Sequence, residues 1–319
     1  RRARRARRSE EAAVVVRFFA VAAAVVLTTG SAAAAAAQSP SPTDSARVVL
    51  LGTGTPRPNP EASQAATAVV VGQRVFLVDA GAAVMRQLAA AGLPVNGVSA
   101  LFLTHLHTDH TLGYPDLVLT SWVMGRRTPL EAYGPRGLRR MTDHLLAAWS
   151  EDIAIRTNGL EREAPGGYRV AVHEIRAGVV YDSGGVRVTA IPVQHGEWRD
   201  AFAFRFDTPD RSIVISGDTR PSAALEQAAR GVDVLVHEVY PETRLAPEQR
   251  PGGEHWPDYM RAFHTSDVEL GRLAAAAQPR LLILSHIVRM GGTDAELLAG
   301  VRSGGFTGRV VIGRDLERY

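Results

Sequence analysis

A cluster of metal-binding residue types stands in the segment THLHTDH, residues 104–110. His105 and His107 lie two positions apart on a segment expected to be extended, so their imidazole rings face the same way and can share one metal ion. Asp109 and His110 follow past a turn and can serve a second ion. Four ligand-type residues within six positions are improbable in an ordinary solvated loop. The spacing therefore predicts a two-metal site.

Two divalent ions held close together can activate water, because they lower the pKa of a bound water molecule from about 15.7 towards about 7. The chain contains no cysteine, so imidazole and carboxylate groups must hold any such ions. This ligand set favours zinc. We therefore predict a hydrolase that uses two divalent metal ions, expected to be Zn²⁺, with Asp109 steering the attacking water and accepting its proton.

Three further ligand-type residues each follow an apolar run that is expected to be a strand. They are His195 in IPVQHG, Asp218 in SGDT and His286 in LILSH. A strand end holds the backbone in place while the next loop turns side chains inward, which suits metal ligands. A lone histidine at a strand end is more often structural, and Asp218 could simply cap a helix near Pro221. The repeated placement favours metal binding for all three.

The expected elements alternate along the chain in a way that indicates layered sheets covered by helices. Apolar runs between turn residues predict strands at 48–51, 68–71, 75–78, 101–103, 186–191, 213–215, 234–236, 281–284 and 310–312. Helical patterns occur at 82–91, 138–149, 222–230, 265–277 and 294–303. The stretch between His110 and His195 is expected to be mostly loop, with the helix at 138–149 and short strands.

The amino-terminal part differs in composition from the rest. Residues 1–37 hold arginines, then an apolar run, then small residues, so they are expected to be a signal peptide or an amino-terminal membrane anchor. A disordered basic tail followed by an alanine helix is the alternative. A Pro/Ser-rich linker is expected over 38–46 and a hydrolase domain over 47–319. We therefore expect an exported protein, periplasmic or secreted, which stays membrane-tethered if the signal is not cleaved.

The positive charge of the chain is concentrated at its start. The formal net charge is +3, and residues 1–37 carry seven arginines and two glutamates, a net of +5, so the remainder carries −2. A body with this charge offers little general attraction for a polyphosphate backbone.

Several longer motifs resemble a known family, the metallo-β-lactamase superfamily, and within it the branch of ribonuclease Z and arylsulfatase-like hydrolases. The motifs include THLHTDHTLG, VLVHEVY, FHTS and LILSH, and the resemblance covers residues 48–319. It implies an α/β fold, a four-layer αββα sandwich with the metals at one edge of the paired sheets. The ligand set that it implies is His105, His107 and His195 for one zinc, Asp109, His110 and His286 for the other, and Asp218 as the bridge.

The same resemblance singles out two residues beside the scissile group, His264 in FHTS and Glu238 in VLVHEVY. It implies that a protonated His264 stabilises or protonates the leaving oxygen, while Glu238 orients the ring. The alternative is structural: Thr265 would be the N-cap of the helix at 265–277, and His264 only its neighbour.

The substrate is the least constrained part of the prediction. Ribonuclease Z acts on precursor transfer RNA with an extra arm, and no basic glycine-rich insertion of that length stands between His110 and His195. Together with the net charge and the expected export, this predicts a small-molecule phosphodiester or aryl sulfate ester as substrate and no nucleic-acid partner. The alternatives are a ribonuclease Z-like tRNA 3′-end endonuclease, a lactonase or β-lactam hydrolase, and a non-catalytic metal-binding protein. Related enzymes often pair, which implies a homodimer.

Two features bear on the substrate pocket. The stretch GTGTPRPNP, residues 52–60, lacks the Gly-Lys-Ser/Thr ending of a phosphate loop and is expected to line the metal cleft as a turn. Aromatic residues are mostly core, and one or two are expected to line the pocket out of Trp122, Tyr133, Trp149, Trp198, Trp256 and Tyr259.

Overall fold

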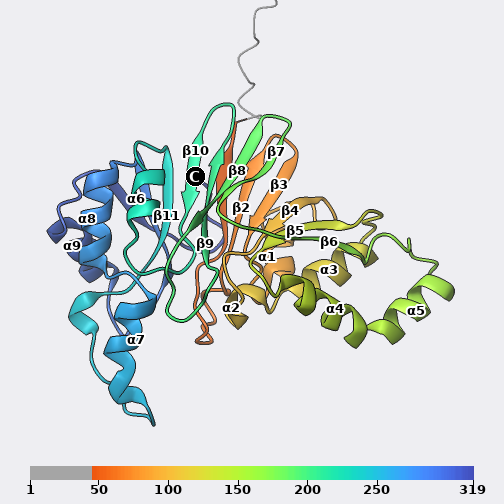
Figure 1. Cartoon of the computed structure of the whole chain (residues 1–319), viewed down its shortest axis with the longest axis horizontal. Coiled ribbons are helices and arrows are strands. Elements are labelled where there is room, and N and C mark those ends of the chain that lie inside the picture. Colours follow the sequence, from red (N-terminus) through yellow and green to blue (C-terminus); the bar gives the residue numbers. More distant parts are fainter. Residues whose placement is uncertain (1–44) are drawn as a thin grey trace, which may run out of the picture. The chain divides into compact units, whose positions relative to one another are not determined.

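The computed structural model of the chain describes residues 45–319 (Figure 1). The expected signal or anchor at residues 1–37 and most of the expected linker lie outside the described residues. Over 45–319, no helix has both the length and the apolar character needed to cross a membrane.

Two mixed β-sheets form the centre of the described part. The first has the strand order β1-β2-β3-β4-β5-β6, and the second has the order β13-β12-β11-β10-β9-β8-β7. The strands of the first sheet are β1 (Arg47–Gly52), β2 (Ala66–Val71), β3 (Arg74–Val78), β4 (Val98–Phe102), β5 (Leu130–Gly134) and β6 (Val170–Glu174). Those of the second are β7 (Gly178–Ser183), β8 (Val186–Pro192), β9 (Phe202–Asp207), β10 (Ser212–Ile215), β11 (Val234–Val239), β12 (Leu281–Ile287) and β13 (Arg309–Ile312).

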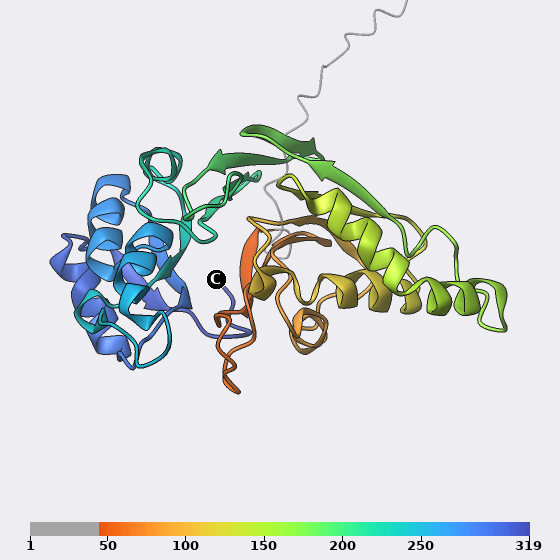
Figure 2. The same ribbon diagram turned by 60° about the horizontal axis from the view of Figure 1, so that its bottom comes forward.

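Helices cover the outer faces of both sheets, as Figure 2 shows. The helices between strands of the first sheet are α1 (Val84–Ala90), α2 (Thr108–Thr111), α3 (Tyr114–Val123), α4 (Leu138–Ala148) and α5 (Ser150–Asn158). The later ones are α6 (Ala223–Ala228), α7 (Trp256–Phe263), α8 (Asp267–Ala277) and α9 (Asp294–Ser303), with short 3₁₀ turns η1 (Glu242–Arg244) and η2 (Gly253–His255).

Alternating side chains on the strands build three hydrophobic layers, because successive residues of a strand point to opposite faces. On β3, Phe76 and Val78 pack between the two sheets, whereas Val75 and Leu77 pack against the helices outside the first sheet. On β11, Leu235 packs in the same way under the helices of the second sheet. Each fully buried side chain of this size contributes about 1.5–3 kcal/mol. The αββα fold class is therefore confirmed.

All the predicted strands and helices overlap observed elements, but the prediction of mostly loop between His110 and His195 is wrong. Helices α3 to α5 and strands β5 to β8 take up most of this stretch. α3 escaped notice because apolar residues such as Leu119 and Val123 also lie outside its buried stripe, so no clear polar face marks it as a surface helix. β7 escaped notice for the opposite reason: most of its residues are exposed and show no apolar alternation.

Parallel pairing aligns the ends of the strands that precede the site residues. In the second sheet, Ile215 of β10 pairs with Val236 of β11, which pairs with Ile283 of β12. In the first sheet, Val78 at the end of β3 pairs with Phe102 at the end of β4. The segments that follow these strands consequently begin at the same edge of each sheet.

The loop after β1 is anchored by a carboxylate near the carboxyl end of the chain. Asp315 accepts hydrogen bonds from the N–H and the hydroxyl of Thr53, both at 2.9 Å, from the N–H of Ser63 at 2.7 Å and from the amide of Gln87 at 2.8 Å. Both ends of the loop are thereby tied to one side chain.

We predict that Asp315→Ala lowers the free energy of unfolding by about 2–4 kcal/mol, because it leaves several partly buried donors without a charged acceptor. Urea denaturation measures this change. Asp182→Ala is the control, since Asp182 is exposed on β7 and its pair with Arg187 should contribute less than about 1 kcal/mol. Equal midpoints for the two variants would contradict the anchoring role.

Candidate metal centre

The structure brings all nine residues selected from the sequence together at one edge of the sandwich. His105 and His107 lie between β4 and α2, Asp109 and His110 in α2, His195 after β8, Asp218 after β10, Glu238 in β11, His264 at the end of α7 and His286 in β12. All of them except His107 are buried. Their roles in metal binding and catalysis remain predictions.

Three imidazole rings converge in a first group. Nε2 of His105 lies 2.9 Å from Nδ1 of His107, and Nε2 of His195 lies 3.1 Å from the same atom. The Nδ1–H of His195 donates to the carbonyl of Phe263 at 2.7 Å, so its Nε2 carries a lone pair that faces the other rings. A cation would stabilise nitrogen atoms held this close together.

Asp109, His110 and His286 form a second group. Nε2 of His286 donates to Oδ2 of Asp109 at 3.0 Å, and Nε2 of His110 lies 3.7 Å from the same oxygen. Asp218 reaches both groups: its Oδ1 is 3.4 Å from His110 Nε2, and its Oδ2 is 3.9 Å from His195 Nε2. Asp218 therefore has the position expected of a bridge.

Unsatisfied buried atoms test whether the residues present fit a pair of ions. His110 Nε2, Asp218 Oδ1 and His286 Nδ1 are buried without a hydrogen-bond partner. Such atoms cost roughly 1–3 kcal/mol each when they stay unpaired. Among the described residues, potential ligand atoms cluster within 4.8 Å of one another in two groups, the first including Asp218. Five imidazoles and two carboxylates suit divalent ions such as zinc, so the site fits two of them.

Asp79, which the sequence analysis missed, orients this site from behind. Its carboxylate accepts hydrogen bonds from the backbone N–H of Thr104 at 2.8 Å and from the Thr104 hydroxyl at 2.9 Å. It also accepts one from Nδ1 of His110 at 2.8 Å. Because the hydroxyl proton of Thr104 is donated to Asp79, its oxygen accepts from Nδ1 of His105 at 3.0 Å. One signal could have revealed Asp79: it follows a strand directly, in VDAG, as the selected residues do.

Burial keeps the first group of histidines neutral. It lowers the pKa of His105 well below 6.5 and the pKa of His195 to about 4. Neutral imidazole is the form that binds metals. Burial also opposes the charge on His110, but the carboxylates of Asp218 and Asp79 outweigh it and raise the pKa of His110 well above 6.5. Metal binding through His110 must therefore displace a proton.

Glu238 holds His264 in one orientation. Its Oε1 accepts hydrogen bonds from the backbone N–H groups of Thr219 at 3.1 Å and Thr265 at 3.2 Å, and lies 3.2 Å from Nδ1 of His264. Burial lowers the pKa of His264 to about 4, so the ring is neutral at pH 7 and differs from the protonated ring that the resemblance implies. With Nδ1 donating to Glu238, Nε2 of His264 is an acceptor.

Two structural alternatives are excluded by the helix caps. Ser222, and not Asp218, caps α6 by accepting from the N–H of Leu225. Ser266, and not Thr265, caps α8 through a capping box with Glu269. Neither side chain therefore caps the helix that follows it; His264 caps the end of α7 only through its backbone N–H.

A cavity of about 790 Å³ opens on this site. Its lining includes Asp109, Asp218 and His264, and also Arg57 from the loop after β1, which confirms that the stretch at 52–60 lines the cleft. Of the six aromatic residues considered, Trp256 and Tyr259 line the cavity. Trp122 is fully buried in the core, and the indole N–H of Trp198 donates to Nε2 of His107 at 2.9 Å.

The chain belongs to the β-lactamase superfamily, because the family model described as a β-lactamase superfamily domain matches residues 74–287. It is a metal-dependent hydrolase with the metallo-β-lactamase fold. Its relatives include ribonuclease Z of Mycobacterium sp. strain KMS, which is 36% identical over 278 residues covering 85% of this chain and 94% of that protein. Ribonuclease Z of Mycobacterium bovis strain BCG Pasteur is 34% identical, with 85% and 96% covered.

Solved structures share the fold at lower identity. A metallo-β-lactamase fold protein from Bacillus subtilis superposes with a TM-score of 0.65 and 19% identity, covering 86% of this chain and 98% of that one. The short form of human tRNase Z has a TM-score of 0.65 and 20% identity, with the same coverage.

The expected function, hydrolysis of small phosphodiester or aryl sulfate esters without a nucleic-acid partner, is wrong. The relatives that cover most of the chain are ribonucleases Z. An alignment of 278 positions that spans 85% of this chain leaves no room in the first relative for a long insertion that this chain lacks, so the arm argument does not set this chain apart from it. The net charge was also misleading, because it averages over the surface and does not describe the cavity.

We predict that Asp79→Asn weakens zinc binding by about 10- to 100-fold, because the amide cannot orient His110 as the carboxylate does. Competition with a chromogenic chelator measures the zinc dissociation constant, and circular dichroism checks the fold. Asp207→Asn is the control: Asp207 pairs with Arg205 at the end of β9, away from the site. Equal zinc affinity in Asp79→Asn and the wild type would disprove the orienting role.

Proposed function

We propose that the chain is a ribonuclease Z-like endonuclease that cleaves precursor transfer RNA at its 3′ end. The observation that carries this proposal is the 36% identity to a ribonuclease Z over 94% of that protein's length. The geometry supports it: a buried cluster suited to two metal ions lies beside a neutral histidine at the bottom of a cavity with room for part of an RNA strand.

In this proposal the two groups of ligands hold the two ions. His105, His107 and His195 would hold one, Asp109, His110 and His286 would hold the other, and Asp218 would contact both. When bound, the ions supply a Lewis acid and a water molecule of lowered pKa. The rest of the chemistry depends on the protein's own side chains.

Asp109 is placed to orient the attacking water. Burial raises the pKa of this carboxyl group, but the hydrogen bond from His286 and the nearby His110 outweigh that effect and lower the pKa overall. Asp109 is therefore ionised at neutral pH. Its Oδ2 is engaged by His286, which leaves Oδ1 to accept a hydrogen bond from water at the cavity floor.

His264 is placed to transfer a proton. Its Nδ1 faces Glu238, and its ring lines the cavity, so Nε2 is available to a substrate oxygen. The attacking water releases one proton as it bonds to phosphorus, and the leaving oxygen takes up one. Because its ring is neutral at pH 7, His264 would accept the released proton at Nε2 and pass it to the leaving oxygen. Glu238 contributes by fixing which nitrogen takes part.

The substrate class is tested directly with purified, zinc-loaded protein. The test substrate is a precursor transfer RNA that carries a 3′ trailer. We expect the protein to cut this RNA between the acceptor stem and the trailer and to leave a lactone unchanged. Lactone hydrolysis without RNA cleavage would overturn the proposal.

We predict that His264→Ala retains both metals but slows RNA cleavage by about 100-fold or more, because proton transfer to the leaving oxygen is lost. Single-turnover kinetics measures the rate, and elemental analysis measures the metal content. His173→Ala is the matched control, since His173 is an exposed residue of β6 that pairs with Glu131. An unchanged rate in His264→Ala would disprove its role in proton transfer.

A further inference from the structure

α7 carries a row of aromatic side chains that leads from the metal centre to the mouth of the cavity. Trp256 and Tyr259 stack with centroids 5.2 Å apart and planes at 18°, and Tyr259 and Phe263 stack at 4.3 Å and 24°. Phe263 in turn lies 6.4 Å from the ring of His107, at 20°. Each ring in this row, from His107 to Trp256, thus lies within 24° of parallel to the next one.

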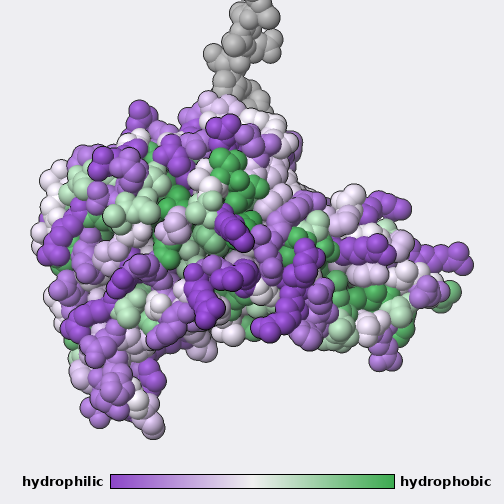
Figure 3. Space-filling view, in the orientation of Figure 1, coloured by the Kyte–Doolittle hydropathy of each residue, from purple (hydrophilic) through white to green (hydrophobic). Residues whose placement is uncertain are grey.

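The outer part of this row packs against a small hydrophobic cluster on one side and faces the cavity on the other. The fully buried residue of α7 is Met260, which packs with Tyr240 and Val288. Trp256 and Tyr259 are only partly buried and line the same cavity as the metal centre. In Figure 3 the outer surface at the lower left, where Figure 1 places α7, is mainly hydrophilic.

Two guanidinium groups lie over the last ring of the row. The Cζ atoms of Arg57 and Arg250 are 5.6 Å and 5.5 Å from the centroid of Trp256. Both arginines also pair with Glu248, whose side chain is 19% exposed against 62% for Arg57 and 53% for Arg250. The cavity thus has two cations at its mouth, held by one carboxylate, and acidic groups at its floor.

This combination matches the chemistry of a nucleotide. Bases stack on aromatic rings whatever their sequence, because every base has a π-face. Guanidinium groups stack on the same rings and also bind phosphate with paired hydrogen bonds. A volume of about 790 Å³ lies within the usual range for ligand sites and extends from the catalytic residues to Trp256.

Resting on the proposed function, we propose that Trp256, Arg57 and Arg250 form a subsite for one unpaired nucleotide next to the scissile phosphate. The base stacks on Trp256 in the place of a guanidinium group. The released arginines leave Glu248 and bind the phosphate of that nucleotide. The subsite selects a nucleic-acid strand over a simple ester, because only the strand supplies both a base and a second phosphate.

The first experiment measures binding of precursor transfer RNA to zinc-loaded His264→Ala protein by fluorescence anisotropy. We expect Trp256→Ala to raise the dissociation constant by about 5- to 100-fold, and Trp256→Phe to restore most of the affinity. An RNA with abasic sites at the two nucleotides that flank the cleavage position should bind the parent protein correspondingly more weakly. The same abasic RNA should bind Trp256→Ala no more weakly than the complete RNA does.

The control is Trp149→Ala, because Trp149 is 42% exposed between α4 and α5 and lies outside the cavity. We expect it to bind both RNAs like the parent. If Trp256→Ala weakens complete and abasic RNA by the same factor, or weakens neither, base stacking is disproved.

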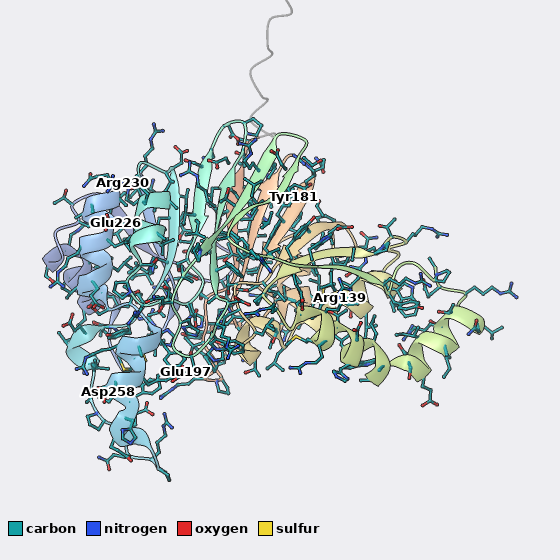
Figure 4. The ribbon with its side chains drawn as sticks, in the orientation of Figure 1. Arg139, Tyr181, Glu197, Glu226, Arg230 and Asp258 are labelled. Atoms are coloured by element: carbon teal, nitrogen blue, oxygen red, sulfur yellow. The ribbon has the colours of Figure 1, made fainter. Side chains whose placement is uncertain are left out.

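The second experiment tests the phosphate contacts. Replacing both Arg57 and Arg250 by alanine should reduce the slope of log Kd against log salt concentration by about 1.4, which corresponds to two lost contacts on a single strand. Glu248→Gln should bind RNA more tightly, since the substitution removes the carboxylate that pairs with Arg57 and Arg250 and so frees both side chains for phosphate. Arg261→Ala is the control, because Arg261 lies on α7, is exposed and pairs with Asp258, which Figure 4 labels on the same helix. An unchanged salt slope in the double variant would overturn the phosphate contacts.

The experiments distinguish failure of the proposed function from failure of the proposed subsite. Base-dependent binding through Trp256 without cleavage by the wild type would overturn the proposed function and keep the subsite. Cleavage by the wild type with no base-dependent effect of Trp256 would keep the function and overturn the subsite.

Discussion

The functional centre depends on one buried carboxylate. Asp218 has an oxygen within 4.0 Å of a ring nitrogen of His110, His195, His264 and His286. Burial by itself raises the pKa of this group, but the neighbouring imidazoles outweigh burial and hold the pKa well below 3.8. A charge in such a dry place is tolerated only when partners surround it closely. The fold must therefore bring the ends of separate strands to one point.

The two sheets meet this requirement at the cost of local strain. Asp79 and His286 have left-handed backbone angles, with φ of 63° and 44°, which cost about 1–3 kcal/mol each for residues other than glycine. Gly217, just before Asp218, has φ of 57°, and a Cβ atom there would meet the side chain of Thr104 at 2.7 Å. The paired strands, the hydrophobic layer between the sheets and the hydrogen bonds to Asp79 hold this edge in place.

The residues at the mouth of the cavity come from different kinds of segment than the residues of the metal centre. Most metal-binding residue types lie at or just after strand ends, whereas Arg57, Arg250 and Trp256 come from a loop after β1 and from the segment around α7. Charge therefore cannot be averaged over the chain to predict the substrate. A body with a net charge of −2 still presents two arginines beside an aromatic ring at the mouth of its cavity.

From the sequence, local periodicity predicted most of the strands, and residue types at strand ends predicted seven residues of the centre. The resemblance of short motifs to a known family implied the αββα fold, His264 and Glu238. The sequence did not reveal Asp79, the row on α7 or the helix α3, and the neutral state of His264 at pH 7 also required the structure. Only the tertiary structure decided what these features do: Asp79 contacts Thr104 and His110 from another strand, and distant charges surround His264. Burial and the neighbouring charges set a pKa, and the rings of α7 meet His107 and Arg57 only because the fold brings those separate segments beside the helix.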